Sequence, residues 1–160
     1  MNAIDLLIRQ HRTLEAALRA AQDAETAKRA HAVTRLADDL GKHMSSEEQV
    51  FYPAVRAHRT EDILLESLEE HLSLKRLLAD LLELDSTAET WPAKLKVLDE
   101  QTRHHHREEE EHLFPKVRKC WSEAELKDLG EQIEALQAAL VRTGQARAAA
   151  EQTDAAAPLS

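Results

Sequence analysis

The sequence predicts an all-α protein: an antiparallel up-down four-helix bundle built from two helical hairpins, with a fifth helix at the C-terminus. Three observations predict this fold. The 160 residues include only 3 Gly and 4 Pro and are rich in Ala, Leu, Glu, Lys and Arg, which favour helices. No stretch alternates apolar and polar residues as a half-buried strand does. One motif, HxxxEExxx(Y/F)P, occurs twice, over residues 43–53 and 105–115.

Apolar periodicity places the first hairpin in the N-terminal half of the chain. The first helix is expected from about Ala3 to Asp23, and the second from about Thr26 to His58. Pro53 is expected to kink or end the last turns of the second helix, because proline lacks the backbone N–H that a helix interior needs.

The second hairpin follows a short polar connection. A third helix is expected over about 61–84, and a fourth begins near Trp91 with Pro92 in its first turn and reaches about Lys119. Ser122 and Glu125 then form a capping-box signature for a fifth helix, which ends near Thr143.

These elements divide the chain into three parts. Residues 1–120 are expected to form one metal-binding bundle, large enough for a proper core. Residues 121–146 are expected to form a helix that packs on the bundle or on a partner. Residues 147–160 carry no apolar stripe, so a disordered tail is expected there.

Each copy of the motif is preceded by a helix with one histidine at its centre, His11 in the first half and His71 in the second. Apolar residues lie three and seven positions to either side of both histidines. They are Ile4, Ile8, Leu14 and Leu18 in the first half, and Leu64, Leu68, Leu74 and Leu78 in the second. Both histidines therefore lie in a buried stripe, where an unpaired polar ring is costly. The pattern indicates a duplicated helical hairpin.

The motif itself indicates a metal site. Its His and Glu are four residues apart, which places them about 40° apart around a helix and lets both reach one cation. Four histidines and two carboxylates form a mixed nitrogen and oxygen set that suits iron better than magnesium or calcium. With two such pairs, two metals are expected. The candidate ligands are His11, His43, Glu47, His71, His105 and Glu109.

The chain resembles the hemerythrin-like, HHE cation-binding family. The resemblance covers about Asp5 to Pro115 and includes the Asp-x-Leu-x-x-x-His opening of residues 5–11 and the doubled HxxxE pattern. It implies a four-helix bundle with a non-haem centre of two iron ions, bridged by two carboxylates and an oxo or hydroxo group. Carried over position by position, it implies the same six ligands.

One departure from the oxygen-carrying hemerythrins bears on function. Those proteins have a second histidine four residues after the first on the third helix, and this chain has Lys75 there and Ser67 on the other side of His71. The site is therefore expected to lack one nitrogen ligand. A metal with fewer protein ligands favours reaction with a small oxidant over reversible transport of O2.

Several neighbouring residues leave alternatives open. The fourth helix also carries His104, His106 and His112 beside the site, and Glu108, Glu110 and Glu111. We interpret His106 and Glu110 as outer or solvated residues because they lie 100° further round the helix. Glu110 nevertheless lies five residues after His105, which is the spacing of the fourth-helix Asp ligand in the oxygen-carrying hemerythrins. We interpret Tyr52 as a packing aromatic; the alternative is a phenolate ligand to ferric iron that the kink at Pro53 turns inward.

Composition restricts the partners and the compartment. The net charge of −9, without a basic cluster, argues against nucleic acid as a partner. The single cysteine, Cys120, excludes an internal disulfide. The absence of a long apolar run or an export signal predicts a cytoplasmic protein with no membrane partner.

The expected function is that of a di-iron protein that binds and reacts with a small oxidant, either a diatomic ligand (O2 or NO) or peroxide, in oxidative or nitrosative stress. As an enzyme it would be a peroxide- or NO-consuming oxidoreductase. The alternative is a non-catalytic sensor of O2, redox state or iron that acts through a partner. Leu126, Leu129, Ile133, Leu136 and Leu140 recur at helical spacing on the fifth helix and could dock on the bundle, on a second copy of the chain (a homodimer) or on a partner protein.

Overall fold

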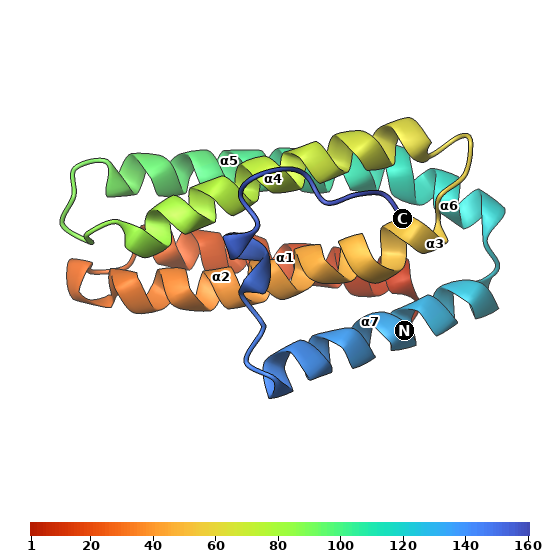
Figure 1. Cartoon of the computed structure of the whole chain (residues 1–160), viewed down its shortest axis with the longest axis horizontal. Coiled ribbons are helices and arrows are strands. Elements are labelled where there is room, and N and C mark those ends of the chain that lie inside the picture. Colours follow the sequence, from red (N-terminus) through yellow and green to blue (C-terminus); the bar gives the residue numbers. More distant parts are fainter.

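In a computed structural model, which describes residues 1–160, four long helices form an antiparallel bundle (Figure 1). α1 and α5 lie side by side and antiparallel, as do α2 and α4, and each of the four contacts two neighbours in the order α1, α2, α4, α5. The predicted up-down bundle of two hairpins is therefore confirmed. The four helices are α1 (Ala3–Gln22), α2 (Arg29–Ser46), α4 (Glu61–Glu83) and α5 (Trp91–Glu108).

Both motif-bearing helices continue past their last α-helical turn through a π-turn. α2 passes through η2 (Glu47–Phe51) into the single turn α3 (Tyr52–Ala54), and α5 passes through η3 (Glu109–Leu113) into α6 (Phe114–Cys120). The second helix was predicted to reach His58 and ends four residues earlier. Thr60 explains the end, because its hydroxyl donates to the carbonyl of Val55 at 2.7 Å and closes the loop.

Side chains cap the starts of two helices. The Asn2 side chain accepts a hydrogen bond from the backbone N–H of Asp5 at 2.9 Å and caps α1. Ser122 and Glu125 form the predicted capping box at the start of α7 (Glu123–Arg142). A short 3-10 turn, η1 (Thr26–Lys28), leads into α2.

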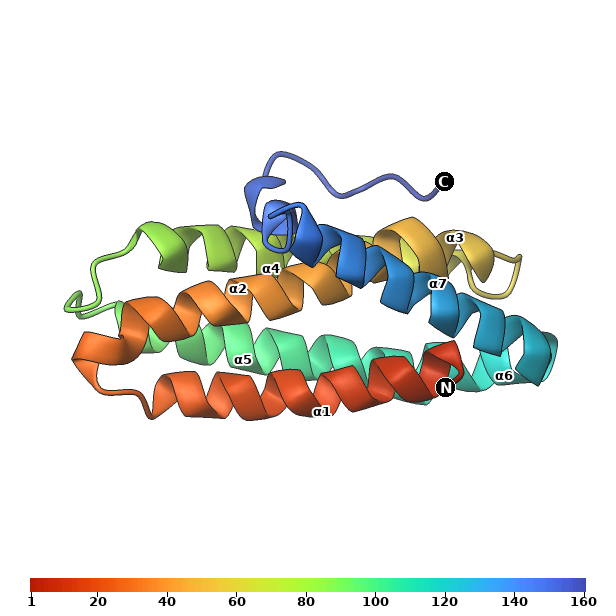
Figure 2. The same cartoon turned by 90° about the horizontal axis from the view of Figure 1, so that it is seen from below.

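α7 runs obliquely across α1 and α2 on the outside of the bundle (Figure 2). It buries Leu126, Leu129 and Ile133 against the N-terminal end of α1 and the π-turn region of α2. Gly130 permits the close approach, since a Cβ atom there would lie 2.4 Å from the carbonyl oxygen of Met1. Of the two alternatives for the apolar stripe, packing on the bundle applies to Leu126, Leu129 and Ile133.

Residues 147–160 differ from the disordered tail that the sequence suggested. They pass over α2 and α4 (Figure 1), and a 3-10 turn, η4 (Ala148–Glu151), buries Ala149 and Ala150 against them. The backbone carbonyls of Thr153 and Asp154 accept hydrogen bonds from Arg76. Hydrogen bonds and scattered apolar contacts of Ala149, Ala150, Ala156, Ala157 and Leu159 hold this segment, and neither produces an apolar stripe. The division of the chain at residues 120 and 146 stays a prediction.

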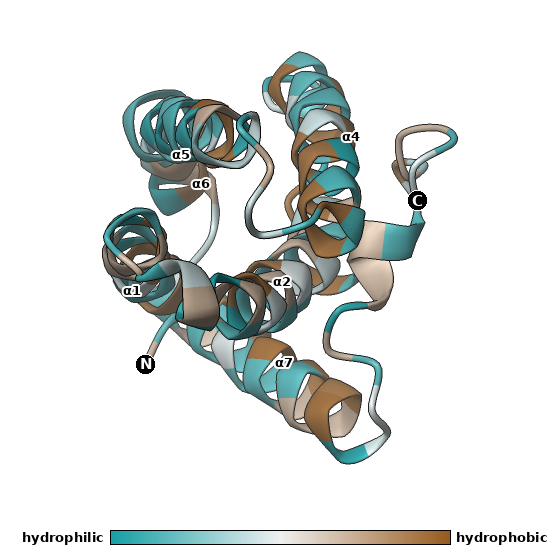
Figure 3. Cartoon of the chain, turned by 90° about the vertical axis from the view of Figure 1, so that its left-hand side faces the viewer, coloured by the Kyte–Doolittle hydropathy of each residue, from teal (hydrophilic) through white to brown (hydrophobic).

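The core consists of two apolar clusters with a polar layer between them. One cluster includes Leu14, Leu18, Leu78 and Trp91, and the other includes Ile4, Leu7 and the aromatic residues of the π-turn regions. His11 and His71 lie between them along their helices. Viewed along the bundle, hydrophilic residues dominate the outer surface (Figure 3). None of the helices combines the length and the apolar character that crossing a bilayer requires.

Candidate metal centre

The structure brings all six predicted ligands together in the polar layer. α1, α2, α4 and α5 each contribute one histidine, and the two π-turns each begin with one of the glutamates. Every one of these side chains is buried, with at most 2% of its surface exposed. They are His11, His43, His71, His105, Glu47 and Glu109.

The histidines form two groups, and both carboxylates lie between them. In the α4/α5 group, the Nε2 atoms of His71 and His105 are 3.0 Å apart. Glu47 Oε1 lies 3.2 Å from Nε2 of His71 and 3.3 Å from Nε2 of His43, which belongs to the other group.

Glu109 joins the same two groups from the opposite motif. Its Oε1 atom lies 3.3 Å from Nε2 of His11 and 3.3 Å from Nε2 of His105. We call His11 and His43 the α1/α2 group. Each carboxylate therefore stands where it can bridge one cation in the α1/α2 group and another in the α4/α5 group.

Many buried polar atoms at this centre have no hydrogen-bond partner. An unpartnered polar atom in a protein interior costs roughly 1–3 kcal/mol, so such atoms are rare in isolation and rarer in clusters. A cation between the imidazole nitrogens and carboxylate oxygens would satisfy them together. The donor set therefore fits a metal. The unpartnered atoms at the centre are Nε2 of His11, of His43 and of His106, Oε2 of Glu47 and Oε1 of Glu109.

His106 is the residue that the sequence interpretation missed. It is 1% exposed rather than solvated, and its ring stacks on that of His11 with centroids 3.7 Å apart. Its ring nitrogen lies within 4.8 Å of those of His11 and His43, so it belongs to the α1/α2 group. The repeat gave no signal, because the matching position in the first motif is Met44.

Tyr52 also lies at the centre, as the less favoured interpretation had it. Its hydroxyl donates to Glu109 Oε2 at 2.8 Å and lies 3.3 Å from Nε2 of His71 and 3.5 Å from Nε2 of His105. The π-turn explains this placement. In η2 the N–H of Tyr52 bonds the carbonyl of Glu47, so a residue five positions later returns to the same face. Tyr52 therefore joins the α4/α5 group.

The second π-turn places a phenyl ring at the matching position. The N–H of Phe114 bonds the carbonyl of Glu109, and its ring stacks on His11 with centroids 5.9 Å apart. The two groups are thus related by the repeat but are not identical. The α4/α5 group has the Tyr52 hydroxyl as its third polar group, and the α1/α2 group has the His106 imidazole.

The comparisons with known proteins agree with this geometry. A family model described as the hemerythrin HHE cation binding domain matches residues 2–117. The chain belongs to this family. Its fold is similar to the crystal structure of a hemerythrin HHE cation binding domain-containing protein from Mycobacterium kansasii, with a TM-score of 0.78 and 22% identity over 96% of this chain and 99% of that one.

A curated protein also matches part of this hemerythrin-like chain. It is a DNA nickase from Nostoc sp., 32% identical over 80 residues. The match spans 50% of this chain and 23% of the nickase. Half of this chain therefore corresponds to about a quarter of that protein.

Four imidazoles of the hemerythrin-like centre each contact an oxygen acceptor through Nδ1, the ring nitrogen that points away from the centre. Such contacts to the outer ring nitrogen fix the tautomer and leave the inner nitrogen free for a metal. The pairs are His43 Nδ1 with Gln10 at 2.9 Å, His71 Nδ1 with Glu48 at 2.7 Å, His105 Nδ1 with Glu70 at 2.9 Å, and His106 Nδ1 with Glu15 at 3.2 Å.

The remaining acidic and imidazole neighbours lie further out. Glu110 lies 3.8 Å from Nδ1 of His11, on the side away from the centre, and pairs with Arg12. The side chains of His104 and His112 are 54% and 56% exposed. None of these three residues reaches the cluster of ring nitrogens and carboxylates, so the spacing match between Glu110 and the carrier's Asp does not place Glu110 in the centre.

The electrostatics of the hemerythrin-like centre reflect its paired charges. Burial lowers the pKa of His11, but the close contacts of its ring with the carboxylates of Glu109 and Glu110 outweigh burial and raise the pKa to about 9. Burial opposes ionisation of Glu47, yet the charge of His43 and hydrogen bonds to neighbouring imidazoles hold its pKa well below the usual range. Burial and the charges of neighbouring imidazoles hold the pKa of His106 well below its ordinary value. In the metal-free protein, protons on some imidazoles therefore balance the carboxylates, and His106 stays neutral.

The raised pKa of His11 predicts a pH-dependent stability of the metal-free protein. The pKa of His11 is 6.5 in the unfolded protein and about 9 in the folded protein. Protonated His11 therefore contributes fully to the free energy of unfolding below pH 6.5, and this contribution is lost as pH rises to about 9. Its upper bound is about 3 kcal/mol. Urea unfolding of chelator-treated protein at several pH values is expected to show the free energy of unfolding falling across this interval. A His11→Gln variant should flatten the curve, and an unchanged slope in that variant would contradict the assignment.

The position of His106 predicts a selective defect in metal content. In a His106→Asn variant the α1/α2 group loses one of its three imidazoles, while the α4/α5 group is intact. Metal analysis is expected to show the metal content per chain reduced by about half, with the folded state retained. His104→Asn is the matched control, because His104 is its sequence neighbour and is exposed. Equal metal content in the two variants would contradict the placement of His106.

Proposed function

We propose that this hemerythrin-like chain holds two iron ions and uses them to react with a small oxidant. The α1/α2 group would hold one ion through His11, His43 and His106. The α4/α5 group would hold the other through His71, His105 and Tyr52. Glu47 and Glu109 would bridge both ions. The unpartnered imidazole and carboxylate atoms that meet between two apolar clusters carry the proposal.

The donor set supports iron over the harder divalent cations. Five imidazoles, two carboxylates and a phenol form a mixed set that suits iron and other transition metals, whereas calcium and magnesium prefer oxygen ligands alone. A phenolate is a hard ligand and favours ferric iron. Bound iron supplies one- and two-electron chemistry with O2, peroxide or nitric oxide. We therefore infer an oxidoreductase that consumes peroxide or nitric oxide, in a role in oxidative or nitrosative stress.

The residues of the chain would prepare the centre for this chemistry. Oxygen acceptors hold the outer ring nitrogen, Nδ1, of four histidines, so that the inner nitrogen, Nε2, keeps its lone pair for the metal. The acceptors are the carbonyl of Gln10 and the carboxylates of Glu48, Glu70 and Glu15. Apolar clusters on both sides exclude water along the bundle axis. In the metal-free protein the Tyr52 hydroxyl donates to Glu109, and it would lose this proton on binding iron.

Metal analysis followed by a peroxide assay tests the proposal. Protein purified aerobically is expected to contain two irons per chain, and added hydrogen peroxide is expected to disappear with release of O2. His11→Ala combined with His71→Ala, which removes one ligand from each group, should lose both properties. Absence of transition metal from the wild-type protein after anaerobic loading with ferrous iron would refute the metal centre. Loaded protein that leaves both peroxide and nitric oxide unchanged would refute the catalytic part.

A second candidate function is a sensor that passes the state of the metals to a partner. One contact favours it: Gln137 on α7 bonds Gln10, which holds His43. α7 also has a half-buried Leu136 and Leu140 and an exposed Val141, which could contact a second copy or another protein. Iron-loaded protein that changes spectrum with O2 but turns nothing over would favour this function. Nicking of DNA is not proposed, because most of the matched nickase has no counterpart here.

A further inference from the structure

The C-terminal segment, residues 118–160, lies outside the residues that the family model matches, yet it packs closely on the bundle. The structural match covers 96% of the chain and so extends into this segment. Gly41 in α2 permits the contact, since a Cβ atom there would lie 2.6 Å from the carbonyl oxygen of Ala146. Arg147 pairs with Asp38 of α2 at 2.7 Å. The segment is therefore seated at specific points on the bundle.

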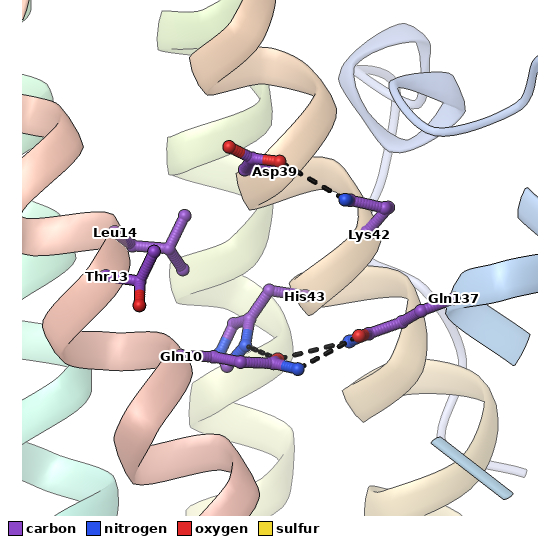
Figure 4. Close-up of a pocket in the computed structure, with 7 residues that line it drawn as sticks. All are labelled: Gln10, Thr13, Leu14, Asp39, Lys42, His43 and Gln137. Atoms are coloured by element: carbon purple, nitrogen blue, oxygen red, sulfur yellow. Dashed lines mark hydrogen bonds and ion pairs between the residues drawn. The ribbon is translucent and has the colours of Figure 1, made fainter. Parts of the chain in front are cut away.

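The first of two links from this segment to the metal centre starts at Gln137 of α7 (Figure 4). Gln10 donates to the Gln137 carbonyl at 2.9 Å, and Gln137 donates back to the Gln10 carbonyl at 3.1 Å and to Ser46 Oγ at 2.9 Å. This pairing holds the two amides together. Ser46 Oγ donates to the carbonyl of His43 and accepts from Gln137, which fixes the orientation of the Gln137 amide and thereby that of Gln10. The Gln10 carbonyl oxygen therefore faces His43, and it accepts the proton of Nδ1 at 2.9 Å. As a result Nε2 of His43 keeps its lone pair toward the centre.

The second link starts at Gln152 and passes through a buried lysine. Lys75 Nζ donates to the Gln152 carbonyl at 3.0 Å and to Glu48 at 3.0 Å, and Lys75 is completely buried. Glu48 in turn accepts the proton of His71 Nδ1 at 2.7 Å. A buried ammonium group requires full pairing. Gln152 therefore holds Lys75 in the position from which it orients Glu48.

The two links reach different metal groups. Gln137 acts on His43 of the α1/α2 group, and Gln152 acts on His71 of the α4/α5 group. We propose that the C-terminal segment is a metal-responsive clamp, in which Gln137 and Gln152 are positioning residues that set these two imidazoles for metal binding. Coupling of this kind is reciprocal, so metal loading tightens the hold of the segment on the bundle by the same factor. This inference rests on the proposed metal centre.

Iron titration of two variants against a chelator of known affinity tests the first half of the proposal. Gln137→Ala and Gln152→Ala are each expected to weaken iron binding at one of the two sites by about 10-fold, the lower end of the effect of losing an outer partner. The near-ultraviolet and visible spectrum of the loaded protein should shift in both variants. Gln132→Ala and Gln145→Ala are the matched controls, because both glutamines are exposed and neither contacts the centre.

Hydrogen exchange of the wild-type protein, metal-free and iron-loaded, tests the second half. Backbone amides of η4 and the last turns of α7 are expected to exchange about 10-fold more slowly in the loaded protein, as reciprocity requires. Equal exchange in both forms would overturn the clamp. It would also be overturned if Gln137→Ala and Gln152→Ala matched their controls in iron affinity and spectrum. Failure of wild-type protein to bind iron would instead refute the metal centre, so the two outcomes are distinguishable.

Discussion

A Glu47→Gln variant is expected to lose both metal ions. Glu47 Oε1 lies 3.3 Å from Nε2 of His43 and 3.2 Å from Nε2 of His71, so one substitution removes a negative ligand atom from both groups. The amide keeps the shape of the side chain but not its charge. Affinity should fall by more than the roughly 10–100-fold cost of losing an outer partner. Metal content measured after dialysis against a weak chelator is expected to fall below one ion per chain.

Glu48→Gln is the matched control for this prediction. Glu48 is the next residue in the chain and is also buried, but it contacts only the outer nitrogen of His71 and the ammonium of Lys75. Its substitution is expected to cost about 10–100-fold at the α4/α5 group and to leave the α1/α2 ion in place. The bridging role of Glu47 would be wrong if both variants kept the same metal content.

A Tyr52→Phe variant is expected to lose the visible absorption of the iron-loaded protein. A phenolate bound to ferric iron absorbs visible light through charge transfer from ligand to metal, and no other tyrosine is present in the chain. Burial, together with the charges of Glu109 and Glu47, raises the pKa of Tyr52 well above its usual range. The phenol is therefore neutral in the metal-free protein and would ionise only when iron binds.

The Phe side chain keeps the packing of Tyr52, which provides the control within the same variant. The ring lies in an apolar cluster with Phe51 and Phe114, so the folded state should persist with a loss of about 1–3 kcal/mol for the unpartnered Glu109 oxygen. The near-ultraviolet absorption of an iron pair should remain. A visible band of unchanged intensity in Tyr52→Phe would show that the phenol does not bind the metal.

The sequence predicted the bundle and six candidate ligands because both follow from the repeat. The stripes around His11 and His71 match position for position, and a helical period converts the HxxxE spacing into a shared face. Comparison of the two repeats could not predict ligands at positions where the repeats carry different residues. His106 corresponds to Met44, and Tyr52 corresponds to Phe114, so comparison of the two motifs hides the third polar group of each metal group.

Helical periodicity could not predict two further features, the position of Tyr52 and the course of residues 147–160. A π-turn changes which residues share a face, and an α-helical wheel therefore places Tyr52 on the wrong side of its helix. The course of residues 147–160 depends on the absent side chain of Gly41 and on backbone carbonyls that Arg76 reaches. Neither interaction leaves a pattern in the residues of the segment itself. Both depend on parts of the chain distant in sequence.

The two apolar clusters that enclose the polar layer limit the hydration of a molecule at the centre. With leucine, phenylalanine and tryptophan side chains filling the bundle on both sides, a molecule that reaches the centre must give up most of its water. An anion or cation pays a desolvation cost far above that of a neutral molecule, which loses only a few hydrogen bonds. We therefore expect O2, nitric oxide and hydrogen peroxide, which are uncharged, to occupy the centre at a lower desolvation cost than superoxide, nitrite or other small anions.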